Sequence, residues 1–175
     1  MNTAAVTTPT HLFFYSGTIY SNFHWTENQF RYRDMSVSSS EVAFMLAKAL
    51  FFGDSETAAK IANAKSSFDA KALGRQVRGY VDREWECVRL GMMQHVLLAK
   101  FGQNPEWAAQ LKATGNRILV EASPVDLVWG AGLDEAACLK HDQNSSFVGA
   151  SLTWPGRNLL GKALMTVRDL LQDRA

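Results

Sequence analysis

The alternation of apolar and polar residues predicts a buried helix in the first third of the chain. The segment 38–52 reads SSSEVAFMLAKALFF, and after Glu41 its only polar residue is Lys48. Serine is a favourable helix cap, and a glutamate in the first turn suits the positive end of the helix dipole. Because a helix that is apolar nearly all round is usually buried, we expect this helix to run through the core.

The same patterns predict further helices and a small sheet. Capping residues and terminal glycines mark helices, and short apolar runs mark strands. We expect helices over residues 56–64, 67–74, 83–101, 105–113 and from an Asn158 cap to residue 172, and strands over residues 12–15, 30–32 and 117–121. Residues 133–153 are polar and lack periodicity, and we expect a surface loop there. Together these elements predict a helix-dominated α+β fold, with one domain over residues 12–173 behind a flexible tail over residues 1–11.

Composition and charge narrow the class of protein. The chain of 175 residues is 47% hydrophobic and 20% charged, and its formal net charge is +1. These values are typical of a globular protein and argue against an extended nucleic-acid surface, while a local basic patch stays open. No apolar run reaches the ~18 residues that a membrane helix needs. Cys87 and Cys138 match no metal-binding spacing, so we expect two reduced thiols and a reducing, cytoplasmic compartment.

Glu41 and Lys48 are the first candidate functional residues. They are seven positions apart, which is about two helical turns, so they share one face with roughly 10 Å between their Cα atoms. One interpretation is structural: Lys48 extends its ammonium to solvent, and Glu41 complements the helix dipole. In the other interpretation both residues line a pocket, where burial lowers the pKa of the lysine and makes its amine a nucleophile.

Aromatic and glycine-containing loops supply further candidates. Phe23 belongs to the turn-like segment SGTIYSNFHW, whose aromatic rings either stack on a base or pack onto the core. Asp126 and Trp129 lie three residues apart in a loop. Gly130 follows them and permits a close approach of the backbone to a ligand.

Two positions near helix ends are candidates for binding an anion. Arg75 directly follows the helix expected over 67–74, where its guanidinium can bind either helix carbonyls or a ligand phosphate. Gly161 lies in the first turn of the last helix. There the lack of a side chain makes room either for another helix or for a phosphate held by the helix N-terminus.

Taken in order, these motifs resemble the NADAR family over about residues 13–172. The motifs that carry the resemblance are Ser21-Asn22-Phe23, Glu41 followed by Lys48, Leu73-Gly74-Arg75, Trp85, Lys100-Phe101, Thr114-Gly115, LVEASP at 119–124, Asp126, WGAG at 129–132 and NLLGK at 158–162. The chain departs from the family in the segment around Glu41. Many members have an EHYFQAQK type of sequence there, whereas this chain has Val42 in place of the histidine and Leu46 or Ala47 in place of the glutamine.

The resemblance implies hydrolysis of an N-glycosidic bond between a ribosyl C1 and a base nitrogen. Family substrates include ribosylamino-pyrimidine intermediates of riboflavin biosynthesis and ADP-ribosylated guanine in DNA. Because no riboflavin-pathway domain accompanies the motifs, we favour ADP-ribosylated guanine, with the phosphoribosyl intermediate as the alternative. A non-catalytic module that binds ADP-ribose or a nucleotide also stays open. No metal or cofactor is expected, and the oligomeric state cannot be predicted.

The resemblance also assigns roles to the candidate residues. Lys48 would attack C1 and form a Schiff-base-like intermediate, with Glu41 holding the ribose or moving a proton and Asp126 orienting the sugar or the lysine. Each expected substrate-binding residue lies in one of the matched motifs. These residues are Asn22, Phe23, Arg75, Trp85, Trp129, Gly130, Asn158 and Gly161. Among these, the two tryptophans would pack on ligand rings, and Arg75 with the start of the last helix would bind phosphate.

Overall fold

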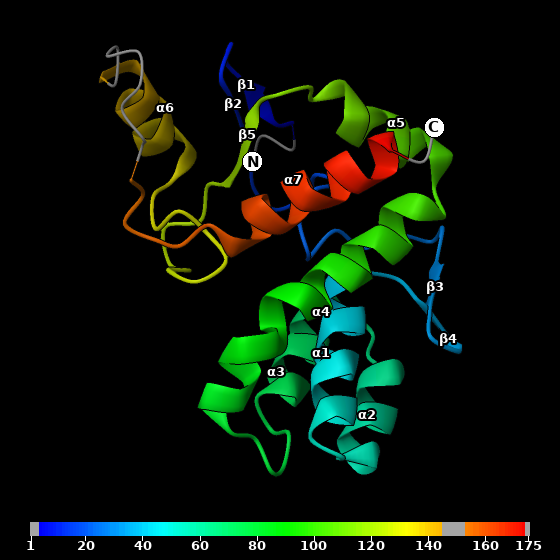
Figure 1. Cartoon of the computed structure of the whole chain (residues 1–175). Helices are drawn as coiled ribbons and strands as arrows, with labels where there is room; N and C mark the ends of the chain where they lie inside the picture. The colour runs from blue at the N-terminus through cyan, green and yellow to red at the C-terminus, as the bar shows by residue number, and fades with distance from the viewer. Residues whose placement is uncertain (1–3, 145–152, 174–175) are drawn as a thin grey trace. The chain divides into compact units, whose positions relative to one another are not determined.

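The structure, a computed structural model, describes residues 4–144 and 153–173. The chain divides into two compact units. The first unit contains the described residues up to Ser21 and from Gln110 onward, and the second contains Asn22–Ala109. In Figure 1 the second unit carries the labels β3, β4 and α1 to α4. Parts of the expected tail and of the expected loop, at residues 1–3 and 145–152, lie outside the described residues.

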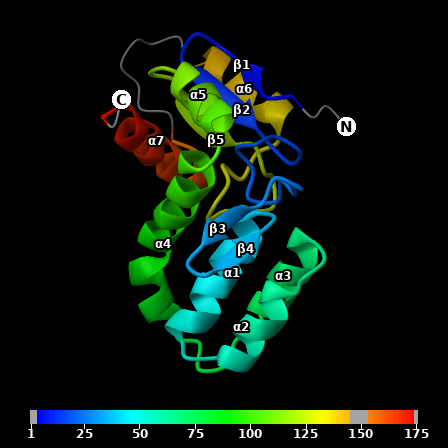
Figure 2. The same cartoon turned by 90° about the vertical axis from the view of Figure 1, so that its right-hand side faces the viewer.

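The second unit is built around the helix that the hydrophobic pattern predicted. Its elements are β3 (Phe30–Tyr32), β4 (Met35–Val37), α1 (Ser40–Phe51), α2 (Ser55–Ala62), α3 (Ser67–Gly74) and α4 (Asp82–Gly102). Helix α1 packs against α2, α3 and α4, and Figure 2 shows it between α4 and the α2–α3 pair. Nine of its twelve residues are buried, because neighbouring helices cover almost every face. The Ser39 hydroxyl caps its start by accepting the Val42 N–H at 3.2 Å.

The first unit has a small sheet with helices beside it. Its elements are β1 (Val6–Thr7), β2 (His11–Phe14), β5 (Ile118–Glu121), α6 (Glu135–Asn144) and α7 (Leu159–Gln172), and α5 (Pro105–Ala113) enters it from the second unit. Strand β2 is central: it pairs antiparallel with β1 and parallel with β5. Helix α6 contacts β2, and α7 contacts β5. A buried cluster of Phe13, Val120, Ala122, Ala131 and Cys138 forms part of the core.

The helix-dominated α+β fold is confirmed, and three local expectations are corrected. The three expected strands do not form one sheet, because Phe30–Tyr32 pairs with β4 and not with β2 or β5. The expected tail contains β1, which pairs with β2. The expected loop contains α6, whose start is capped by Asp134 accepting the Ala137 N–H at 2.8 Å. Whether residues 12–173 fold as one domain stays a prediction.

Two further findings bear on expectations from composition. Among the described residues, no helix is long and apolar enough to cross a membrane. Cys87 is exposed, Cys138 is buried, and both are free thiols. Burial raises the pKa of the Cys138 thiol to about 12, so this thiol stays protonated at neutral pH and acts as a small core residue.

Candidate active site

The start of α1 holds a buried cluster of polar groups. The backbone N–H of Glu41 donates to the Asn22 carbonyl at 3.0 Å, which ties the loop before the helix to its first turn. The Ser67 hydroxyl donates to the Phe23 carbonyl at 3.2 Å, and it shares a hydrogen bond with the Ser39 hydroxyl at 2.9 Å. These bonds join the loop, α1 and the start of α3. Glu41 lies within this cluster and is only 4% exposed.

Two atoms of this cluster have hydrogen-bonding capacity that the protein does not use. Asn22 Oδ1 and Ser40 Oγ are buried, and neither has a hydrogen-bond partner in the described part of the chain. Almost all buried polar atoms in folded proteins are hydrogen-bonded, because an unpaired one costs free energy. Unpaired acceptors beside a buried carboxylate are what a site for sugar hydroxyls requires, since hydroxyls donate hydrogen bonds.

Lys48 lies on α1 two turns beyond Glu41 and is half-buried. Its Nζ donates to the Gly74 carbonyl at 2.9 Å and lies 4.0 Å from the centre of the Tyr80 ring. Burial lowers the pKa of Lys48, while the charges of Asp82 and Glu41 act in the opposite direction. The lowered pKa favours the free amine, the form that can act as a nucleophile.

Two neighbours fix the surroundings of the Lys48 amine. Gly74 ends α3 so close to α1 that a Cβ at this position would overlap the Met45 side chain, and this approach brings the Gly74 carbonyl to Lys48. Tyr80 donates its hydroxyl to Asp82 Oδ1 at 2.7 Å, which orients the ring beneath the lysine. The amine is therefore positioned by named contacts and is not simply extended into solvent.

Lys100 on α4 is a second unusual lysine, and it was assigned no role from the sequence. It is 0% exposed, and burial lowers its pKa to about 7. Its Nζ lies 5.5 Å from the Phe101 ring centre and 5.6 Å from that of Trp107. Pattern analysis gave no signal for it, because a lysine in an amphipathic helix normally faces solvent.

The other candidate residues of the second unit either pack against the protein or are exposed. Trp85 is 5% exposed and packs against Phe44, with ring centres 5.1 Å apart, and against two further phenylalanines. This packing accounts for Trp85 as a core residue and does not support ring contact with a ligand. Arg75 is exposed at the C-cap of α3, and its phosphate role stays a prediction. The Phe23 ring packs on Phe68 at 5.0 Å.

In the first unit, Asp126 organises the loop that contains Trp129. Its Oδ1 accepts the backbone N–H groups of Val128 at 2.9 Å and Trp129 at 2.8 Å. An aspartate that accepts nearby amides in this way shapes a turn. Both Asp126 and Trp129 are partly exposed, and their expected contacts with the sugar and with a ligand ring stay predictions.

At the start of α7, protein groups already bind several backbone donors, and the expected phosphate site stays a prediction. The backbone N–H groups of Leu159 and Leu160 each donate at 3.1 Å, to the carbonyls of Val128 and Trp129. The Asn158 side chain accepts the Glu121 N–H at 3.1 Å and donates to the Leu119 carbonyl at 2.8 Å, so it also serves β5. These donors are occupied by the loop and the strand, and the helix start does not offer them to an anion.

The glycines at this junction are explained by backbone packing. A Cβ on Gly161 would overlap the Leu119 carbonyl oxygen, and one on Gly130 would lie 2.7 Å from Ser123 Cβ. The Gly130 carbonyl also accepts the Asn158 N–H at 3.0 Å. Of the two alternatives for Gly161, the close approach of another element is therefore the one that the structure supports. These contacts give Asn158, Gly130 and Gly161 a structural role, and their expected contacts with a ligand stay predictions.

The family model named NADAR domain matches residues 7–172 of the chain. The chain belongs to the NADAR family. The N-glycosidase R617 of Acanthamoeba polyphaga mimivirus is 37% identical over 131 residues, which cover 75% of this chain and 72% of that relative. The riboflavin biosynthesis protein VVA0006 of Vibrio vulnificus is 32% identical over 124 residues, which cover 71% of this chain and 29% of that relative.

A solved NADAR relative has the same fold. The NMR structure of the Escherichia coli protein YbiA superposes with a TM-score of 0.73 at 28% sequence identity, covering 97% of this chain and 89% of that chain. A relative of this name from the same organism is described as an N-glycosidase. The likeness extends across both units of the present structure.

The departures from the NADAR pattern in α1 have a structural explanation. Leu46 and Ala47 are almost completely buried, so the positions before Lys48 serve the core in this chain. Val42 is also buried, and its N–H is bound by the Ser39 cap. Among the described residues, no group of three or more His, Cys, Asp or Glu side chains is placed to hold a metal ion.

Proposed function

We propose that the protein is an N-glycosidase that cleaves the bond between a ribosyl C1 and a base nitrogen. The observation that carries the proposal is the buried cluster at the start of α1, where Asn22 and Ser40 leave unpaired oxygens beside Glu41 on the helix that also carries Lys48. Membership of a family with relatives named N-glycosidase supports the same activity. The expected substrate is an ADP-ribosyl or phosphoribosyl compound.

The proposed reaction begins with the Lys48 amine attacking C1. The new C1–Nζ bond forms as the bond to the base breaks, and the departing base nitrogen takes a proton from the Glu41 carboxyl group. Nζ then returns a proton to Glu41, which passes it to the ring oxygen as the sugar opens to an iminium. Water adds to C1, and collapse of this adduct releases the sugar and restores the lysine.

The geometry around Lys48 fits this sequence in two respects. Burial lowers the pKa of its ammonium, which increases the fraction of nucleophilic amine. The Gly74 carbonyl and the Tyr80 ring hold the nitrogen until a substrate arrives, and the side chain exchanges these contacts for C1 when it reacts. Asn22 and Ser40 would accept hydrogen bonds from the ribose hydroxyls, which fixes the sugar during attack.

Within this activity we propose ADP-ribosylated guanine in DNA as the substrate. The near-neutral net charge of +1 suits recognition of one modified nucleotide more than that of a long duplex. A second candidate is a phosphoribosylamino-pyrimidine intermediate of riboflavin synthesis. It is favoured by the relative named riboflavin biosynthesis protein, which the chain matches over 29% of that relative's length.

The test is release of free sugar from each substrate in turn. The wild-type protein should release ADP-ribose from ADP-ribosylated DNA and restore unmodified guanine in the strand, and Lys48→Ala and Lys48→Met should each lose at least about a thousandfold in rate. Circular dichroism checks that both variants fold, and Met keeps the length of the buried side chain. Lys60→Ala, at an exposed lysine on α2, is the matched control and should retain full activity.

Three outcomes would reject parts of the proposal. Full activity in folded Lys48→Met would reject the lysine nucleophile. Release from the riboflavin intermediate alone would select the second substrate. Tight binding of both compounds by the wild-type protein without release of free sugar would show a binding module and not an enzyme.

A further inference from the structure

A pocket in the second unit lies next to the polar cluster and contains none of its members. Its volume is about 220 Å³, which is below the roughly 300–1,000 Å³ of sites for drug-sized ligands. A single ring system fits such a space, whereas a whole dinucleotide does not. The lining comes from the loop before β3, from β4, from the first turn of α1 and from the segment after α2; its residues are Trp25, Gln29, Ser36, Val37, Ser38, Val42, Ala62, Asn63, Ala64 and Lys65.

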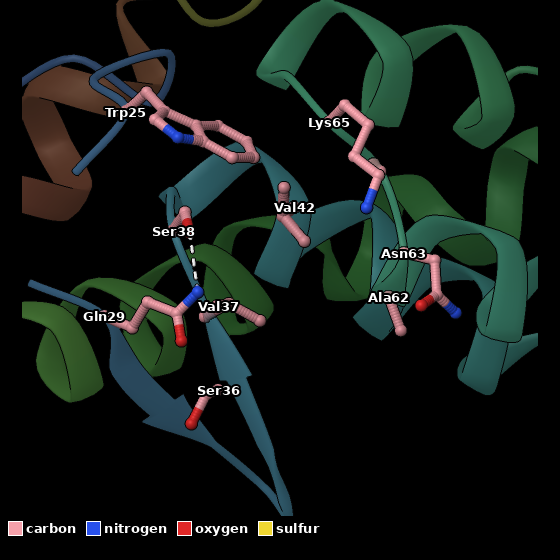
Figure 3. Close-up of a pocket in the computed structure, with 10 residues that line it drawn as sticks. Trp25, Gln29, Ser36, Val37, Ser38, Val42, Ala62, Asn63 and Lys65 are labelled. Atoms are coloured by element: carbon pink, nitrogen blue, oxygen red, sulfur yellow. Dashed lines mark hydrogen bonds between the residues drawn. The ribbon is translucent and has the colours of Figure 1, made fainter. Parts of the chain in front are cut away.

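Two side chains of opposite character face each other across this pocket. Figure 3 shows the Trp25 ring and the Lys65 side chain directed toward the space above Val42. Trp25 is 41% exposed, which is unusual for the largest apolar side chain. Lys65 is exposed and forms no ion pair within the described ranges 4–144 and 153–173. An aromatic face and a cation are thus open to the same ligand.

Polar groups line the opposite wall of the pocket. The Ser38 hydroxyl accepts Gln29 Nε2 at 3.0 Å, as drawn in Figure 3. Ser36 and Asn63 also line the space and have exposed side chains. Hydroxyl and amide groups both donate and accept hydrogen bonds, so this wall can meet the edge of a heteroaromatic base whichever polar atoms that edge presents.

We propose that this pocket binds one nucleotide, with its base stacked on Trp25 and its phosphate at Lys65. Val42 directly follows Glu41 on α1 and forms part of the lining, so the nucleotide lies beside the ribosyl site. An aromatic side chain can stack on any base, and a single lysine can neutralise one phosphate. The chemistry is the same for a free nucleotide and for the neighbour of a modified nucleotide in a strand. The second case rests on the proposed function.

Binding can be measured without any turnover. The probe is a fluorescein-labelled single-stranded DNA octamer, titrated by fluorescence anisotropy over a range of salt concentrations, with dGMP as the unlabelled competitor. Trp25→Ala should weaken binding by at least about tenfold, and Trp25→Phe should recover part of the loss. Lys65→Gln should weaken binding and reduce the slope of log affinity against log salt by about 0.7, the value for one phosphate contact on a single strand.

The matched control is Lys60→Gln, which removes one exposed positive charge from α2 and should leave both affinity and slope unchanged. Competition by dGMP that is lost in Trp25→Ala supports a free nucleotide as ligand; binding of the octamer alone supports a nucleotide within a strand. Wild-type affinity and slope in folded Trp25→Ala and Lys65→Gln would overturn the proposal. Lys48→Met should bind normally, so failure of the glycosidase proposal is a separate result.

Discussion

Two lysines of the second unit have a lowered pKa for the same physical reason, and their accessibility separates their roles. Burial is the main cause for both Lys48 and Lys100. Lys100 is completely buried, whereas Lys48 is half-buried and stands on the helix whose first turn carries the polar cluster. A nucleophile must reach its substrate as well as lose its proton. Of the two lysines, only Lys48 is partly accessible, and its role as the nucleophile stays a proposal.

Asp82→Asn should move the acidic limb of the pH–rate profile to lower pH. The Asp82 charge raises the pKa of Lys48 against the effect of burial, so removing this charge lowers that pKa further. The fraction of free amine then rises at a lower pH, and kcat/KM, which follows the free amine, rises with it. The asparagine can still accept the Tyr80 hydroxyl. The measurement is kcat/KM between pH 5 and pH 9.

Glu86→Gln is the control for a general loss of negative charge, because Glu86 lies on α4 as Asp82 does. Glu86 forms an ion pair with Arg89 at 3.0 Å and is not among the charges that act on Lys48. Its profile should coincide with that of the wild-type protein. An acidic limb that stays in place in Asp82→Asn, or moves to higher pH, would show that Lys48 does not control the profile.

At the scale of elements, the starts of two helices differ in how their polar groups are hydrogen-bonded. The start of α1 retains unpaired buried oxygens on Asn22 and Ser40. At the start of α7, Leu159 and Leu160 donate to loop carbonyls, and the Asn158 side chain is bonded to β5. Unused hydrogen-bonding capacity therefore points to α1, although the helix dipole alone favours both starts equally.

Gly161→Ala should destabilise the fold without involving any ligand. The new Cβ would meet the Leu119 carbonyl of β5, and forced overlap with backbone typically costs about 1–3 kcal/mol. Gly91→Ala in α4 is the matched control, because a Cβ there meets nothing within 4 Å. It should stabilise the helix by about 0.5–1 kcal/mol, since glycine is a poor helix former.

Urea unfolding of the two glycine variants measures both changes. The account predicts free energies of unfolding that move in opposite directions from the wild-type value. Unchanged stability of Gly161→Ala, accompanied by weaker substrate binding, would instead restore the phosphate role that the sequence suggested for this glycine.

The sequence predicted α1 well, because its long apolar run and its serine cap describe a buried helix directly. It missed α6, since Cys138 is the only buried residue among those of that helix whose burial is described, 135–143, and one buried position gives no periodicity. The Asn158 side chain was expected to cap α7, yet it bonds to β5. Such a choice between two hydrogen-bond partners depends on where a distant strand lies, and local sequence does not contain that information.

The candidate site was also predictable only in the part that depends on local sequence. Glu41 and Lys48 could be paired because helical spacing is local information. The surroundings of Lys48 could not be predicted, because Gly74 and Tyr80 contact it from other parts of the chain. Likewise, Trp25 and Lys65 are forty residues apart in sequence, and only the folded second unit brings them to one pocket.

At the scale of the whole molecule, family membership and the local chemistry point to the same class of reaction. The NADAR model takes in both units, and relatives of the chain are named as N-glycosidases. The resemblance to the family first pointed to Lys48 as the nucleophile. The structure adds that its amine is partly buried, positioned by contacts and on the same helix as Glu41, and the catalytic role of Lys48 stays a proposal.

Reductive trapping of the covalent intermediate tests this choice most directly. The protein is incubated with ADP-ribosylated guanine DNA and borohydride, and tryptic peptides are analysed by mass spectrometry. The account predicts a stable ribosyl adduct on Lys48, formed only with substrate and absent in Lys48→Met, while Lys100→Met still forms it. Release of ADP-ribose without an adduct on Lys48, or an adduct on another lysine, would contradict the account.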